Sequence, residues 1–155
     1  MVGLRGKLLL IATLSGLALP ASAEDGVYHG DLEAVFTPAG VLGPRWEIVE
    51  ETLVPADPEQ RTAGVETTRT RHYTLATPSG SRVCSVEIWA FTAVTAAKSA
   101  MPHFDAPRWR FERRGNLVVM LRGVRLEAGD FRPGLLPECR RLAELTELRA
   151  ESLLD

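Results

Sequence analysis

The chain has 155 residues, of which 45% are hydrophobic and 25% are charged, and its formal net charge is −2 at pH 7. This length fits one domain with a single buried core. The slightly acidic balance argues against general nucleic-acid binding, which requires a basic surface.

The first 23 residues predict a cleavable export signal. Arg5 and Lys7 give a short positive region, and Leu8 to Leu19 form an uncharged apolar run. Pro20 ends this run, and Ala21-Ser22-Ala23 has the small-x-small pattern that signal peptidase accepts. The run is too short for a stable membrane anchor, and no cysteine follows it to carry a lipid.

We therefore expect residues 1–23 to be removed and residues 24–155 to form a single α+β domain. Because Arg5 and Lys7 leave with the signal, the remaining 132 residues carry a net charge of −4. We expect such a protein to be periplasmic or secreted, without a membrane anchor after cleavage.

The N-terminal half of this domain predicts a short helix and two strands. Asp31 is placed to cap a helix over Leu32–Phe36. Apolar alternation indicates a strand over Arg45–Val54, and β-branched content indicates another over Val65–Ala76. The Pro- and charge-rich stretch from Pro55 to Gly64 is expected to be a mobile loop.

A returning strand is predicted over Arg82–Phe91, after the turn at Pro78-Ser79-Gly80. One set of its alternating side chains is uniformly apolar and should face the core: Cys84, Val86, Ile88 and Ala90. The other set, which includes Glu87 and Trp89, should face outward.

A helix over Ala93–Met101 should follow and lie close to the sheet, because it is rich in alanine. Arg108–Arg113 then reads as a strand with Trp109 and Phe111 facing in. Gly115 can supply the positive φ of a tight turn, and Leu117–Leu121, apolar on both faces, reads as a central strand.

The last predicted elements are a loop over Glu127–Pro133 and a helix that begins at Pro137. Cys139 lies on the apolar stripe of this helix, and Cys84 lies on the core face of its strand. The only two cysteines of an exported chain favour a disulfide. Closing a loop of roughly 56 residues would contribute about 4 kcal/mol in the chain-entropy model.

The predicted fold class is α+β, with a single antiparallel sheet of about five strands and helices packed on one face. The C-terminal helix should be disulfide-linked to that sheet. The other face, which carries Glu87, Trp89, Arg108, Arg110 and Glu112, is expected to be open to solvent or covered by a partner.

Motifs for chemistry are weak. The sequence has no G-x-S-x-G or S-x-x-K nucleophile motif and no Gly-rich phosphate loop. His29, His72 and His103 do not have metal-ligand spacing, so no metal or cofactor is expected. An envelope hydrolase whose site is assembled only by the fold, with Glu87 and His72 as acid and base, is an alternative.

The strongest local anomaly is a basic stretch with six arginines in 18 residues: Arg108, Arg110, Arg113, Arg114, Arg122 and Arg125. Arginine forks suit carboxylates and phosphates. The sequence therefore predicts a binding site around Trp89, Arg108 and Arg110, although a solvated hairpin paired with acidic residues explains the same pattern.

Two segments resemble parts of small exported α+β modules of bacteria. Residues 31–35 and 41–46 are similar to the opening helix and "LG-x-x-W" turn of these modules, and residues 111–119 resemble their "RRGN-apolar" hairpin. These modules are often sensor or lipoprotein domains without a settled activity. The resemblance therefore implies a non-catalytic extracytoplasmic domain and transfers no active-site residue.

The resulting expectation is an exported, non-catalytic binding domain of the cell envelope, with an envelope protein or an anionic ligand as its partner. The alternatives are the envelope hydrolase and an accessory subunit of an envelope complex.

Overall fold

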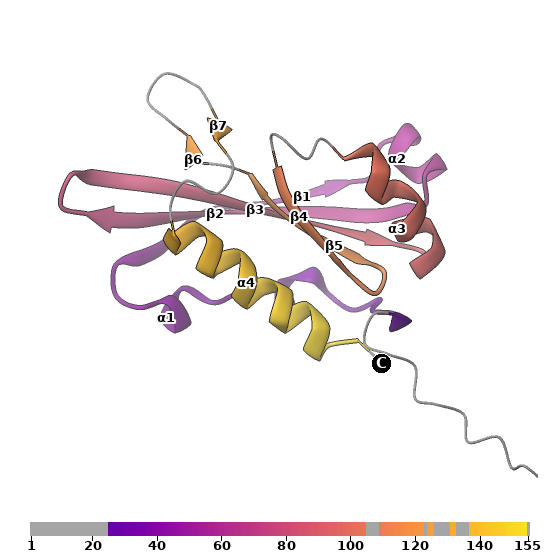
Figure 1. The fold of residues 1–155 in the computed structure, drawn as a ribbon, viewed down its shortest axis with the longest axis horizontal. Coiled ribbons are helices and arrows are strands. Elements are labelled where there is room, and N and C mark those ends of the chain that lie inside the picture. The colour runs from indigo at the N-terminus through magenta and orange to yellow at the C-terminus, as the bar shows by residue number, and fades with distance from the viewer. Residues whose placement is uncertain (1–24, 105–108, 123, 126–130, 133–136, 155) are drawn as a thin grey trace, which may run out of the picture.

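A computed structural model describes residues 25–104, 109–122, 124–125, 131–132 and 137–154. Five antiparallel strands form one sheet in the order β1-β2-β3-β5-β4 (Figure 1). Their bounds are β1 Trp46–Pro55, β2 Val65–Thr77, β3 Gly80–Phe91, β4 Trp109–Arg114 and β5 Leu117–Arg122. A separate two-stranded ladder joins β6, Val124–Arg125, to β7, Phe131–Arg132.

The helical elements are short except for the last one. They are η2 Leu32–Ala34, α1 Ala39–Leu42, α2 Pro58–Thr62, α3 Val94–Ala100, η3 Met101–His103 and α4 Pro137–Ser152. Within the described part of the chain, none of them has the length and apolar character that a membrane crossing demands.

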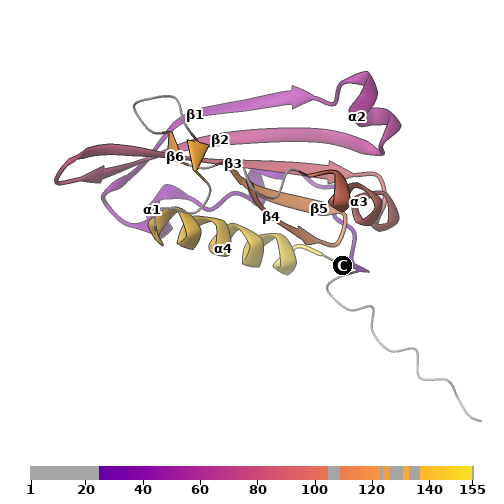
Figure 2. The same cartoon turned by 45° about the horizontal axis from the view of Figure 1, so that its top comes forward.

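The predicted fold class is confirmed, including the covalent link between the last helix and the sheet. Cys84 of β3 and Cys139 of α4 form a disulfide with their Cα atoms 5.7 Å apart, and both residues are buried. Figure 2 shows α4 and α1 on the same side of the sheet. We call this side the α4 face.

The larger hydrophobic core lies on the α4 face. Strand residues such as Tyr73, Val86 and Ile88 pack there with Leu142 of α4 and Phe36 of the N-terminal segment. The alternation predicted for β3 is therefore correct, because its apolar set with Cys84 faces this core.

A second core lies on the opposite face, which we call the α3 face. Phe91, Val118 and Met120 pack there with Ala97 of α3, and Phe91 is fully buried. The expectation that this face is open to solvent or covered by a partner is wrong for this region, because the chain covers it with its own helix.

The same register corrects the orientation of β4. Phe111 lies opposite Met120, so it belongs to the α3 face and not to the core around Cys84. β5 is buried on both faces. Its apolar composition therefore does not indicate which face of β4 packs toward α4. Gly115 does have the positive φ expected of it, at 55°.

Two local predictions also need correction. The segment expected as a mobile loop contains α2, which begins with a capping box in which Asp57 accepts from the Gln60 N–H and Gln60 accepts from the Asp57 N–H. The helix expected over Leu32–Phe36 is a 3₁₀ turn of three residues, although Asp31 caps it as predicted. Of the expected 127–133 loop, Phe131–Arg132 forms β7, and residues 127–130 and 133 lie outside the described residues.

Charged residues hold the segment that contains η2 against the sheet on the α4 face. Arg71 is only 3% exposed, bonds to Glu33 at 2.5 Å and Glu51 at 2.8 Å, and lies 4.6 Å from the centre of the Phe36 ring. The Arg71 hydrogen bond lowers the pKa of Glu33. These contacts fix the path of the chain that leads into α1.

Candidate functional site

The two positions of the predicted binding site that the structure describes, 89 and 110, do not lie on one face. Trp89 lies opposite Val118, which belongs to the α3 face. Arg110 lies opposite Leu121, which belongs to the core beneath α4. The register therefore puts positions 89 and 110 on opposite faces of the sheet, and Arg108 lies outside the described residues. A binding role for these residues stays a prediction.

The hypothetical acid–base pair of the hydrolase alternative is also placed with other partners. His72 Nδ1 lies 2.6 Å from Ser85 Oγ, whereas Glu87 accepts a hydrogen bond from Trp89 Nε1, also at 2.6 Å. Ser85 is 6% exposed and lies inside the sheet between β2 and β5.

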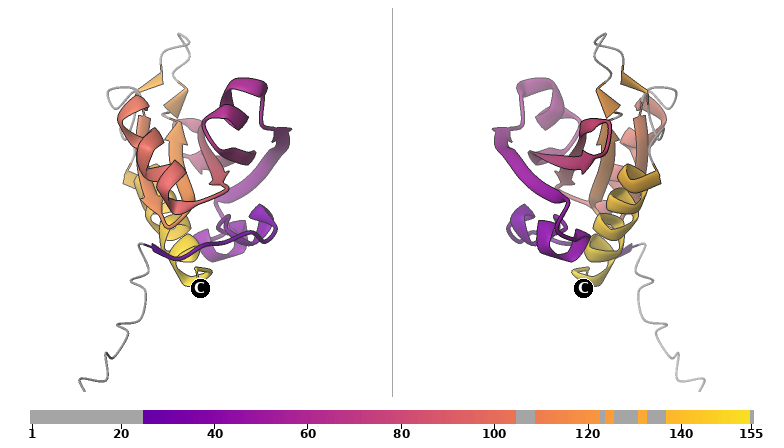
Figure 3. Two further views of the ribbon diagram at one scale, coloured as in Figure 1. Left: turned by 90° about the vertical axis from the view of Figure 1, so that its right-hand side faces the viewer. Right: turned by 90° about the vertical axis from the view of Figure 1, so that its left-hand side faces the viewer.

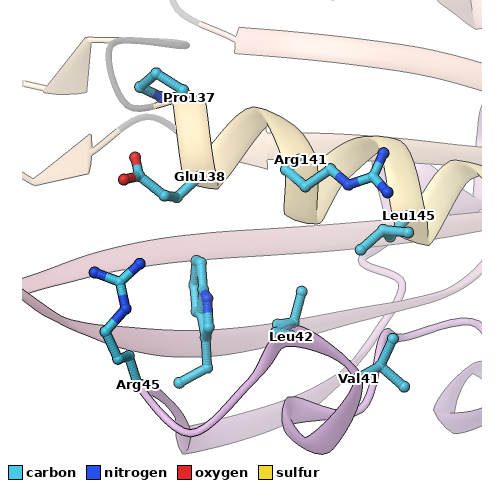
Figure 4. A pocket seen from close by; sticks show the side chains of 8 residues that line it. Val41, Leu42, Arg45, Pro137, Glu138, Arg141 and Leu145 are labelled. Atoms are coloured by element: carbon cyan, nitrogen blue, oxygen red, sulfur yellow. The ribbon is translucent and has the colours of Figure 1, made fainter.

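The described residues instead line two hollows at opposite ends of the sheet. The first, between α1 and α4, has a volume of about 490 Å³ (Figure 4). We call it the basic groove. It is lined by Val41, Leu42, Arg45, Trp46, Pro137, Glu138, Arg141 and Leu145.

Segments far apart in the sequence build the basic groove. The short helix α1 is ended by Gly43, whose φ of 111° turns the chain toward β1. The ring of Trp46 packs edge-on against the buried ring of Tyr73, with centroids 6.3 Å apart. The opposite wall is the first two turns of α4, which the disulfide at Cys139 holds on the sheet.

The groove combines an apolar floor with positive charge. Val41 is 62% exposed, and Leu42, Trp46 and Leu145 are partly exposed. Arg45 has no carboxylate within ion-pair distance among the described side chains, and Arg141 has only Glu144 at 4.0 Å on its own helix. In Figure 4 Leu42 lies between Arg45 and Arg141, which stand toward opposite ends of the lining, and Glu138 lies on the α4 side nearest Arg45.

Glu138 brings one negative charge to the same groove. It lies in the first turn of α4, where the partial positive charge of the helix N-terminus stabilises a carboxylate. The two arginines therefore leave the lining with a positive balance.

The second hollow lies between α2 and α3 and has a volume of about 480 Å³. We call it the acidic pocket. Figure 3, left panel, looks toward this end of the molecule. The lining residues are Asp57, Glu59, Gln60, Ala63, Trp89, Ala100, His103 and Phe104.

Of the predicted site residues whose side chains the structure describes, Trp89 lies at one of these hollows. The sequence interpretation missed Arg45 and Arg141, and a usable signal exists for Arg45 alone: it stands between a Gly-Pro turn and Trp46. Nothing in the sequence singles out Arg141 as a site residue, because a single arginine on the solvent-exposed side of a helix is ordinary.

Neither a metal-ligand cluster nor a comparison with known proteins assigns a role to the two hollows. No group of three or more histidine, cysteine, aspartate or glutamate side chains suited to a metal ion occurs among the residues that the structure describes. No protein-family model, curated protein or solved structure matches the chain.

Proposed function

We propose that the protein is an exported binding domain that acts without catalysis and that its basic groove takes an anionic amphiphile. Such a ligand has an apolar chain and a carboxylate or phosphate head. The observation that carries this proposal is the pairing of Arg45 and Arg141 with an apolar floor in one groove of about 490 Å³.

The size and lining of the groove support a small ligand. Ligand sites have volumes of roughly 300–1,000 Å³ and combine an apolar lining with a few placed polar groups. Trp46, Leu42 and Leu145 can cover an apolar chain, and guanidinium forks bind carboxylates and phosphates with two parallel hydrogen bonds.

Export is supported by separate features. The charged, apolar and small-x-small regions of residues 1–23 have the order of a signal peptide. A disulfide such as Cys84–Cys139 persists in oxidising compartments, including the periplasm and the medium.

The test is calorimetric titration of residues 24–155 with decanoate, decyl phosphate and uncharged decanol. We expect the two anions to bind at least tenfold more tightly than decanol, since a tenfold difference needs only about 1.4 kcal/mol. Combined Arg45→Glu and Arg141→Glu substitutions should remove this preference. Arg45→Glu with Arg140→Glu is the matched control for Arg141, because Arg140 is exposed on the same helix outside the groove lining.

Two results would contradict the proposal. One is equal affinity for decanoate and decanol. The other is turnover of a decanoyl ester that Ser85→Ala abolishes, which would favour the envelope hydrolase.

A further inference from the structure

The acidic pocket has an aromatic floor that is already fixed in place. The rings of Trp89 and Phe104 lie edge to face with centroids 5.3 Å apart, and Phe104 also contacts Phe111 at 5.2 Å. Both Trp89 and Phe104 are partly exposed and line the pocket. A ligand therefore meets a preformed aromatic surface.

The hydrogen bond of the Trp89 indole determines which of its atoms can contact a ligand. Its Nε1–H donates to the buried carboxylate of Glu87 at 2.6 Å, so the indole nitrogen is not available to a ligand. The pocket receives only ring carbons from Trp89. Donation to a carboxylate also raises the electron density of the indole ring, and an electron-rich ring attracts cations over its face.

The rim of the pocket is acidic. Asp57 is the N-cap of α2 and Glu59 lies in its first turn, and neither has a cationic partner within ion-pair distance in the described part of the chain. One Asp57 oxygen caps α2 by accepting from the Gln60 N–H, but the carboxylate keeps its full negative charge. Among the residues that the structure describes, His103 is the one titratable group that lines the pocket from the α3 side.

We propose that the acidic pocket is a second binding site, for a small soluble quaternary ammonium ion. A pocket lined by aromatic rings and by two carboxylates suits such a cation, because the rings attract its alkyl-ammonium groups and the carboxylates neutralise its charge. A neutral ligand would gain the apolar contact alone. This site does not depend on the basic groove, which lies on the other face of the sheet.

The first test compares choline with 3,3-dimethylbutan-1-ol, which has the same shape without the charge. Titration of residues 24–155, followed by tryptophan fluorescence or NMR shifts, should show at least tenfold tighter binding of choline. Equal binding of the two compounds, or no binding of choline at millimolar concentration, would overturn the proposal.

Two variants connect the binding to this pocket. Asp57→Asn with Glu59→Gln removes both charges, and asparagine still caps a helix, so we expect a folded protein with at least tenfold weaker choline binding. Glu47→Gln with Glu50→Gln is the matched control, because it removes two exposed charges from β1 outside the pocket. An equal loss in both double variants would overturn the assignment.

The aromatic contribution and the source of the cation need their own measurements. Trp89→Leu should abolish the choline preference, and circular dichroism would show whether the sheet is retained. If Trp89→Leu unfolds the chain, the charge variants still decide the proposal. Sedimentation with phosphatidylcholine vesicles, without binding of free choline, would overturn a soluble ligand in favour of a lipid headgroup.

Discussion

The basic groove and the acidic pocket have almost the same volume, about 490 and 480 Å³, but opposite charge and different construction. The basic groove joins α1 and the start of β1 to α4, segments separated by more than half of the chain. The acidic pocket lies where short helices follow the ends of β1 and β3. The helices that line them, α1 with the start of α4 and α2 with α3, lie at opposite ends of the sheet (Figure 1).

The two hollows therefore depend on different contacts for their shape. The walls of the basic groove are held in place by long-range contacts. These are the Cys84–Cys139 disulfide, the Arg71 ion pairs and the Tyr73 hydrogen bond to the Thr37 carbonyl at 2.8 Å. The acidic pocket depends on local contacts, namely the cap of α2 and the ring packing around Trp89. Substitutions in one set should therefore leave the other hollow largely intact.

The largest expected effect comes from the disulfide. Cys84→Ser with Cys139→Ser should lower the free energy of unfolding by about 2–4 kcal/mol, because the unfolded chain regains a closed loop of some 56 residues. Urea unfolding of the oxidised protein and the double variant measures this difference. Under conditions where the variant stays folded, we expect decanoate binding to weaken more than choline binding. Two alkylatable thiols in the native protein, or equal losses at both sites, would contradict this account.

The sequence predicts the elements of this fold better than their faces. The β3 alternation and the disulfide partners were predictable, because apolar residues on one parity of β3 and one stripe of α4 both carry a cysteine. The face of β4 was not, because β5 is apolar on both sides and permits either register. That ambiguity is why Trp89 and Arg110 were expected on one face.

The hollows themselves could not be read from the sequence. Arg45 and Arg141, 96 positions apart in the sequence, line one groove only because α4 packs beside α1 and the start of β1. The α2 cap was more accessible, since Asp57, Pro58 and Gln60 have the spacing of a capping box. The proline and charge content of residues 55–64 instead favours a mobile loop. The loop prediction therefore gave no indication that α2 forms one wall of the acidic pocket.

Alkaline pH should loosen the α4 face before the α3 face. Burial raises the pKa of Tyr73 to about 12, against the opposing effect of Arg71 and with small contributions from Glu51 and Glu33. Because the folded pKa lies above the unfolded value near 10, the contribution to stability is complete below pH 10. It is lost as the pH rises toward 12, by about 1.4 kcal/mol per pH unit.

Urea unfolding between pH 8 and 11.5 measures this slope, with absorbance at 295 nm to follow tyrosine ionisation. Tyr73→Phe should be less stable at pH 8, because the Thr37 carbonyl loses its hydrogen bond. The variant should also lack the part of the slope that Tyr73 contributes. An identical slope in the variant would show that Tyr73 does not carry the effect.

The smallest expected effect tests the local side of the comparison. Asp57→Ala removes the side-chain acceptor that caps α2, and loss of such a cap costs about 1 kcal/mol. Asp57→Asn keeps the cap and serves as its control. Because α2 forms only one wall of the acidic pocket, Asp57→Ala should weaken choline binding beyond the loss seen in Asp57→Asn, while decanoate binding stays unchanged. A parallel loss of decanoate affinity would mean that the two hollows are coupled through the sheet, and the division into long-range and local construction would then fail.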